Sequence, residues 1–103
     1  MKETTDLFTQ LVSGQFGVEV IKEYKFCPTR KFRADYAIPS HKILIENEGG
    51  VWVGGRHTSS TGFLKDMEKY NEATALGYRL IRVTPQDLLS EKTLDLIERL
   101  LRL

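Results

Sequence analysis

The sequence predicts a small α/β domain in which helices flank a mixed central sheet, with the element order αβββαβα. Two observations predict it. After a first helical segment come three segments of alternating β-forming residues, and the second and third are close enough for an antiparallel hairpin. A fourth strand is reached only across a helix, which favours parallel pairing. At 103 residues the chain has the length of one domain, so we expect residues 1–103 to form a single domain.

The first half of the chain is expected to hold one helix and three strands. Apolar residues at helical spacing begin after a pair of threonines that can cap a helix, which Gly14 is expected to end. Strands are expected over residues 18–26, 32–38 and 42–48, where β-forming residues alternate or run together.

The second half is expected to alternate helix, strand and helix. A helix is expected to begin at Thr61 or Gly62 and to stop at Gly77, and a strand follows over residues 78–83. The last helix is expected to begin at Ser90, after a helical stretch that a proline opens, and to reach the end of the chain. The inner stripe of the middle helix is expected to consist of Phe63, Met67, Tyr70 and Thr74.

Composition excludes several classes of protein. Lys and Arg total 15 and Asp and Glu total 14, so the formal net charge is +1 and no polybasic tail is present. Cys27 is the single cysteine, which excludes an internal disulfide and a zinc site with two thiolates. The polar, acidic start and the lack of a long apolar run predict no signal peptide, no membrane partner and a cytoplasmic location.

Three carboxylates stand next to the expected core strands. Asp35 lies within the second strand, and Glu46 and Glu48 end the third, where residues two apart share a face. One hairpin register places Asp35 opposite Glu46, and a second places it opposite Leu44 and diagonal to Glu46. Clustered carboxylates repel one another unless a divalent cation with oxygen ligands offsets their charge. The cluster therefore predicts a metal site, and solvated carboxylates on an exposed face are the alternative.

Basic side chains accompany this cluster. Over residues 22–33 they alternate with aromatic residues, which suits a surface that follows a phosphate backbone. A solvated rim of the hairpin would look similar. These basic residues are Lys22, Lys25, Arg30, Lys31 and Arg33. Arg56 and His57 follow Gly54-Gly55 in a long loop and could bind phosphate. In the middle helix, Lys69 could stabilise charge on a phosphate oxygen, or it could simply pair with Asp66.

Seven segments carry a resemblance to a known family. They are EYKF at residues 23–26, TRKFRADYA at 29–37, IENEGG at 45–50, GRHT at 55–58, KDMEKYN at 65–71, GYR at 77–79 and RVTP at 82–85. On these segments the chain resembles the PD-(D/E)XK nuclease superfamily, in particular small phage and prophage endonuclease-like domains akin to Holliday-junction resolvases. The restriction-endonuclease-like core of that superfamily has the order αβββαβ, which matches the order predicted above.

The resemblance implies a metal site. Asp35 and Glu46 match the acids of the D…ExK motif, and the backbone carbonyl of Asn47 would be a further ligand. Glu48 stands where the superfamily has a lysine, which implies that Lys69, in the following helix, supplies it. Glu48 would then be a ligand or a base that orients water.

The resemblance also implies contacts to DNA. An upstream acid is usual in the family, and Glu19 or Glu23 could fill that place. Relatives tend to have a basic residue where Ser59 stands, which removes one expected phosphate contact. The residues expected to bind the DNA backbone are Arg30, Lys31, Arg33, Arg56, His57 and Asn71.

We therefore expect a Mg²⁺-dependent endodeoxyribonuclease that also accepts Mn²⁺, with branched or recombination intermediates among its candidate DNA substrates. No small-molecule cofactor is expected. The last helix is apolar on more than one side, which predicts a dimer seam and a homodimer. Two alternatives remain, namely a nuclease fold that has lost catalysis and only binds DNA, and a protein-interaction module.

Overall fold

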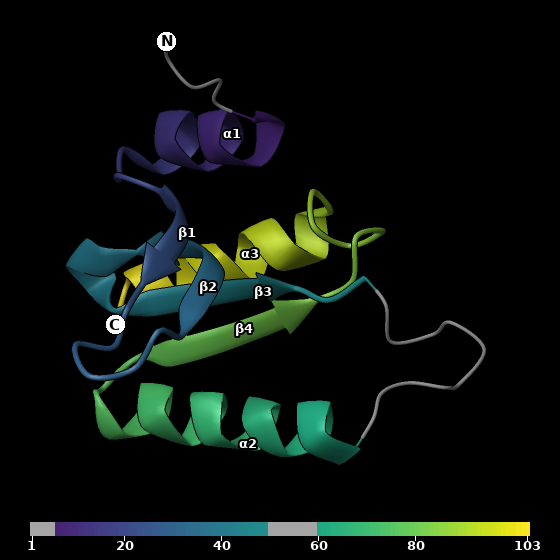
Figure 1. The fold of residues 1–103 in the computed structure, drawn as a ribbon. Coiled ribbons are helices and arrows are strands. Elements are labelled where there is room, and N and C mark those ends of the chain that lie inside the picture. The colour runs from purple at the N-terminus through teal and green to yellow at the C-terminus, as the bar shows by residue number, and fades with distance from the viewer. Residues whose placement is uncertain (1–5, 50–59) are drawn as a thin grey trace, which may run out of the picture.

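The computed structural model describes residues 6–49 and 60–103, and over these residues it shows a four-stranded mixed sheet and three α-helices (Figure 1). The predicted α/β class and the predicted order of elements are confirmed. The elements are α1 (Leu7–Phe16), β1 (Ile21–Lys25), β2 (Arg33–Ile38), β3 (Ile43–Asn47), α2 (Ser60–Ala75), β4 (Arg79–Val83) and α3 (Glu91–Leu101).

The strands lie in the order β1-β2-β3-β4. The pairs β1–β2 and β2–β3 are antiparallel, and β3–β4 is parallel, as expected for strands that a helix connects. A single 3₁₀ turn over Pro39–His41 joins β2 to β3, and Lys42 closes it with a φ of 55°. This turn fixes the hairpin register, in which Tyr36 pairs with Ile45.

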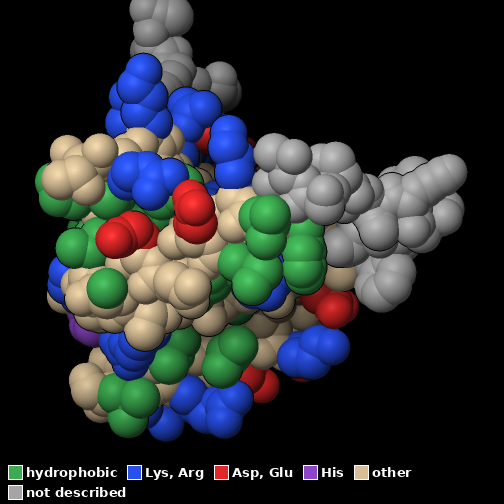
Figure 2. Space-filling view, turned by 60° about the horizontal axis from the view of Figure 1, so that its bottom comes forward, with side chains coloured by type: hydrophobic (Ala, Val, Ile, Leu, Met, Phe, Trp, Pro, Cys, Tyr) green, Lys and Arg blue, Asp and Glu red, His purple; other side chains and the backbone are tan. Residues whose placement is uncertain are grey.

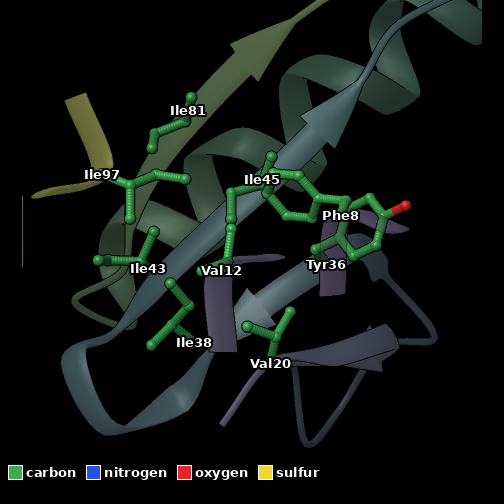
Figure 3. Close-up of a cluster of buried hydrophobic side chains, with 9 residues drawn as sticks. All are labelled: Phe8, Val12, Val20, Tyr36, Ile38, Ile43, Ile45, Ile81 and Ile97. Atoms are coloured by element: carbon green, nitrogen blue, oxygen red, sulfur yellow. The ribbon is translucent and has the colours of Figure 1, made fainter. Parts of the chain in front are cut away.

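The helices α1 and α3 cover one face of the sheet. Phe8 and Val12 of α1 and Ile97 of α3 are fully buried there against side chains of the central strands. The rings of Phe8 and Tyr36 lie 4.5 Å apart between their centroids. Figure 3 shows how these side chains converge in one cluster. Its members are Phe8, Val12, Val20, Tyr36, Ile38, Ile43, Ile45, Ile81 and Ile97.

The helix α2 covers the opposite face, where it packs beside β4 (Figure 1). Ala73 is its buried contact, and the half-buried Leu76 adds to a second, smaller apolar cluster. Small residues on the strands allow this close approach, since Ala34 and Ala37 are buried beneath the helix. The rest of the cluster is built from Phe26, Cys27 and Leu44.

Two expected helix details are wrong. Gly14 does not end α1, which continues to Phe16 and ends at Gly17 in the left-handed region, with φ 67°. Gly14 is exposed within the helix, where the burial of neighbouring turns outweighs its low helix propensity. The residues before Ser90 form hydrogen-bonded turns rather than a helical stretch, although Ser90 does cap α3 by accepting from Thr93 N.

The expected inner stripe of α2 is also wrong at three of its four positions, and only Tyr70 is half-buried. Phe63 and Met67 are 62% and 47% exposed, because only the C-terminal half of α2 lies over the sheet. Tyr70 is half-buried, and Thr74 is exposed while its neighbour Ala73 faces the core. The expected stop at Gly77 is confirmed, with φ 87°.

The apolar sides of α3 mostly face the core. Leu94, Leu96, Leu100 and Leu101 all pack against the buried cluster beneath α1 and α3. The apolar character of this helix is therefore explained within one chain, and the predicted homodimer stays a prediction. Among the described residues, no helix combines the length and the apolar character that crossing a membrane requires.

Candidate active site

Three charged residues form a row across β2, β3 and β4, close to the carboxyl ends of β3 and β4. The β2–β3 ladder ends where Tyr36 pairs with Ile45, so the next position places Asp35 opposite Glu46. On the other side of β3, Glu46 pairs in parallel register with Arg82 of β4. Asp35, Glu46 and Arg82 thus occupy neighbouring positions on β2, β3 and β4, and the first of the two expected hairpin registers is confirmed.

Asp35 is anchored to β3 by its side chain. Its Oδ2 accepts a hydrogen bond of 2.7 Å from the backbone N–H of Asn47, and the residue is half-buried. The N–H of Asn47 thus bonds to this carboxylate where the backbone ladder of β2 and β3 has ended, and the bond holds the carboxylate beside the end of β3. The side-chain Oδ1 of Asn47 is itself buried and has no hydrogen-bond partner among the described residues.

Glu46 is a buried carboxylate in contact with a lysine of α2. Only 7% of Glu46 is exposed, and Lys69 Nζ lies 2.9 Å from its Oε2. Burial raises the pKa of Glu46 above its ordinary value although Lys69 opposes this, and the nearby carboxylates of Asp35 and Glu48 raise it further. Lys69 is thus the charged partner of Oε2, and it is the cation that offsets the buried carboxylate.

Glu48 is held by two partners. Arg82 donates to it from Nε at 2.7 Å and from Nη2 at 3.0 Å, and Tyr70 Oη donates at 2.8 Å. The guanidinium of Arg82 also lies over the Tyr70 ring, 4.5 Å from its centroid. Burial opposes ionisation of Glu48, but these donors bring its pKa below the ordinary value. We call Glu48, Tyr70 and Arg82 the arginine clamp.

The arginine clamp was missed by the sequence reasoning. Tyr70 and Arg82 both lie within the segments that carry the family resemblance, but Tyr70 was expected only as a core residue of the helix and Arg82 had no expected role. The parallel pairing of β3 with β4 was expected, and a residue count along the two strands would have placed Arg82 beside Glu46. The contact of Tyr70 with Glu48 depends on the pitch of α2 over the sheet, which a strand count does not give.

The residues expected to bind a metal ion are only partly brought together. Asp35 and Glu46 lie side by side, whereas both oxygens of Glu48 are engaged by Arg82. Within residues 6–49 and 60–103, no three Asp, Glu, His or Cys side chains are arranged to hold a metal ion. Mg²⁺ is commonly bound by one or two protein carboxylates, with water and substrate phosphate completing its shell. The two adjacent carboxylates of Asp35 and Glu46 fit that requirement in number and in kind of ligand.

Beside Asp35 an open hollow of about 670 Å³ lies between α2 and the connection from β1 to β2. Five basic side chains line it, and three of them were expected to bind DNA. They are Arg30, Lys31 and Arg33, joined by Lys65 and Lys69 of α2. Figure 2 shows Lys and Arg side chains in both the upper and the lower part of the face that it views, with acidic side chains among them. Asn71 is exposed on α2 but does not line the hollow.

Of the two candidate upstream acids, Glu23 is the one that borders the site. It lies between two paired positions of β1 and lines the hollow together with Asp35, whereas Glu19 is exposed and lines no described hollow. Asp6, an acid that sequence reasoning did not consider, borders a smaller hollow of about 260 Å³ with Glu23 and Asp35. Asp6 caps α1 and accepts a hydrogen bond from Tyr36 Oη.

Arg56 and His57, expected to bind phosphate, lie outside the described residues, as does Ser59.

Comparisons with known proteins add no identification. No family model, no curated protein and no solved structure matches this chain.

Proposed function

We propose that the chain is a metal-dependent endodeoxyribonuclease that hydrolyses DNA phosphodiester bonds. One observation carries the proposal: a buried carboxylate, Glu46, lies beside Asp35 and in contact with Lys69, at the edge of a hollow lined by basic side chains. Burying a carboxylate costs free energy, and buried ionisable groups occur more often at functional sites than elsewhere. A solvated cluster of surface carboxylates would not place Glu46 at 7% exposure.

In this proposal Asp35 and Glu46 hold one Mg²⁺ or Mn²⁺ ion, with the backbone carbonyl of Asn47 as a further oxygen. The bound ion would activate a water molecule and neutralise charge on the phosphate. Asn47 keeps Asp35 in place through its N–H, and Lys69 offsets negative charge that builds on the phosphate oxygens. Hydrolysis then breaks the bond from phosphorus to the 3′ oxygen and leaves a 3′-hydroxyl.

The basic hollow would hold the DNA backbone. Arg30, Lys31 and Arg33 approach it from the strand side, and Lys65 approaches it from α2. Such contacts recognise phosphates irrespective of sequence, so base readout is not expected from them. Arg30 also bonds Glu68 at 2.9 Å, an exposed pair that a phosphate could replace at little cost.

Two observations favour the alternative in which the fold only binds DNA. Lys69 already offsets the charge of Glu46, and no cluster of three acidic or histidine side chains stands ready for a metal within the described part of the chain. A protein of that kind would bind DNA through the same hollow but would not cleave it in Mg²⁺ or Mn²⁺.

The test is cleavage of supercoiled plasmid and of a labelled four-way junction in Mg²⁺ or Mn²⁺, with EDTA as the blank. Asp35→Asn and Glu46→Gln should each lower the rate by at least about 100-fold. Asp95→Asn, the same chemical change at an exposed position of α3, should leave it unchanged. Undiminished cleavage by Asp35→Asn would overturn the proposal. DNA binding by the wild-type protein without any cleavage would support the binding-only alternative.

A further inference from the structure

We propose that Arg82 contacts a DNA phosphate in this site and that Glu48 and Tyr70 are positioning residues that hold it for this contact. The inference rests on the proposed nuclease function. It also gives Glu48 a role different from that of a metal ligand.

Arg82 is held from two sides. The carboxylate of Glu48 accepts from Nε and Nη2, which fixes the plane of the guanidinium, and the Tyr70 ring supports one of its faces. Nothing in the described part of the chain accepts a hydrogen bond from Nη1. The side chain of Arg82 is 53% exposed, so that edge can be reached from solvent. A planar fork with a free, oriented edge is well suited to a phosphate oxygen.

Arg82 stands next to the proposed metal-binding acids. It pairs directly with Glu46 in the β3–β4 register, on the side of Glu46 away from Asp35. Paired positions in neighbouring strands direct their side chains to the same face of the sheet. A phosphate bound at Asp35 and Glu46 would therefore have Lys69 above it and Arg82 beside it, whereas the basic hollow lies on the Asp35 side.

A second hollow begins on the far side of Arg82. It has a volume of about 480 Å³, and Arg82 and Glu48 line it together with residues at the start of α3. Lys92 is the further basic side chain among its lining residues, and it is 77% exposed and paired with Asp87 at 3.4 Å. Arg82 thus stands between the acids and this hollow. A DNA strand that extends from the basic hollow past Glu46 would reach Arg82 next.

The contacts of Glu48 show that both of its oxygens are used to orient Arg82. Each of its oxygens accepts from Arg82, and Oε2 accepts from Tyr70 as well. These donors use three of the four acceptor positions of the carboxylate, and a cation at the remaining position on Oε1 would lie beside the positive guanidinium, which opposes it. Holding Arg82 in the folded protein means that little side-chain freedom is lost when a phosphate arrives, which favours binding.

The first experiment measures DNA binding without chemistry. Fluorescence anisotropy with a labelled duplex of about 30 base pairs, in EDTA and between about 50 and 200 mM salt, compares Arg82→Gln with Arg102→Gln. Arg102 is a matched control because it also pairs with a carboxylate, Glu98, but lies at the end of α3. Arg82→Gln should bind roughly ten-fold more weakly, and its slope of log K against log salt should fall by about one. Equal behaviour of the two variants would overturn the phosphate contact.

The second experiment separates a positioning role of Glu48 from metal binding. Glu48→Gln should raise KM for DNA several-fold while the Mg²⁺ concentration for half-maximal cleavage stays unchanged. A higher Mg²⁺ requirement with unchanged KM would overturn the positioning role and make Glu48 a metal ligand. Arg82→Lys should restore the salt slope, because it keeps the charge, but not KM, because a lysine cannot form the fork. Full recovery of KM by Arg82→Lys would equally overturn the positioning role.

These outcomes differ from a failure of the proposed function. If the wild-type protein cleaves no DNA in Mg²⁺ or Mn²⁺, the nuclease proposal fails, yet the binding comparison in EDTA still decides whether Arg82 contacts phosphate. If the wild-type protein cleaves DNA and Arg82→Gln matches Arg102→Gln, the nuclease proposal stands and the inference about Arg82 fails.

Discussion

Replacing Lys69 with Met should destabilise the fold through Glu46. Methionine keeps an unbranched chain of similar length, so the packing along α2 is largely preserved while the ammonium group is lost. Glu46 would then be a buried carboxylate without its partner at 2.9 Å, and the carboxylates of Asp35 and Glu48 would remain nearby. Removing one partner of a buried ion pair leaves an uncompensated charge, which costs more than removing both partners.

The size of the effect follows from the exposure of the pair. Breaking a fully buried pair costs about 3–5 kcal/mol. The side chains of Lys69 and Glu46 are 19% and 9% exposed, so water reaches the lysine end, and the lower limit of about 3 kcal/mol applies. The double variant Lys69→Met/Glu46→Gln removes both charges and should cost only about 1 kcal/mol, because no buried charge remains.

Urea unfolding in EDTA measures this directly. With a slope of about 1.5 kcal/mol per M, the midpoint of Lys69→Met should fall by about 2 M, and that of the double variant by less than about 1 M. Lys65→Met, the same change at an exposed position of α2, serves as the control and should shift the midpoint by less than about 0.3 M. A Lys69→Met midpoint equal to that of Lys65→Met would refute the claim that Glu46 depends on this lysine.

Four further outcomes are expected. Mg²⁺ should raise the thermal midpoint of the wild-type protein but not that of Asp35→Asn in a melting scan, because only protein with both acids would hold the ion. Burial opposes ionisation of Asp6, but its hydrogen bonds from Tyr36 and Thr9 lower its pKa below 3.8. Its ionised form therefore adds stability above that pH, which is lost as the pH falls through the lower folded-state pKa, and acid unfolding of Asp6→Asn should lack this contribution. Ile97→Ala empties a fully buried position and should cost about 3 kcal/mol in urea unfolding. Gly77→Ala places a side chain at φ 87° and should cost about 1 kcal/mol in the same measurement.

Much of the sheet could be predicted because its signals are local. Alternation marked the strands, and the short link through Pro39 allowed only two hairpin registers, one of which the structure adopts. The neighbouring positions of Asp35 and Glu46 follow directly from that register. The sequence left these two registers open, and burial favours the observed one, because a slip of one residue would move Glu46 into the buried position of Ile45.

The rest depended on contacts that no local pattern encodes. Helical spacing suggested that Phe63 and Met67 face the core, but spacing does not show how far α2 extends beyond the sheet. Similarly, Gly14 resembles a helix end, whereas the left-handed position falls at Gly17 because burial of Phe8 and Val12 fixes the helix around them. The contact between Arg82 and Glu48 depends on the register of β3 against β4, which is set only in the assembled sheet.

The topology explains why acids and bases meet at one point. The central strand β3 changes its pairing from antiparallel on the β2 side to parallel on the β4 side. The hairpin partner brings Asp35 to Glu46 as a like charge, and the parallel partner brings Arg82 as an opposite charge. A parallel partner also requires a crossover, and here α2 is that crossover and carries Lys69 above Glu46. The net charge of +1 therefore conceals a local order: one row of the sheet supplies the acids that we propose bind a metal ion, and the crossover and the strand after it supply the bases that we propose bind a phosphate.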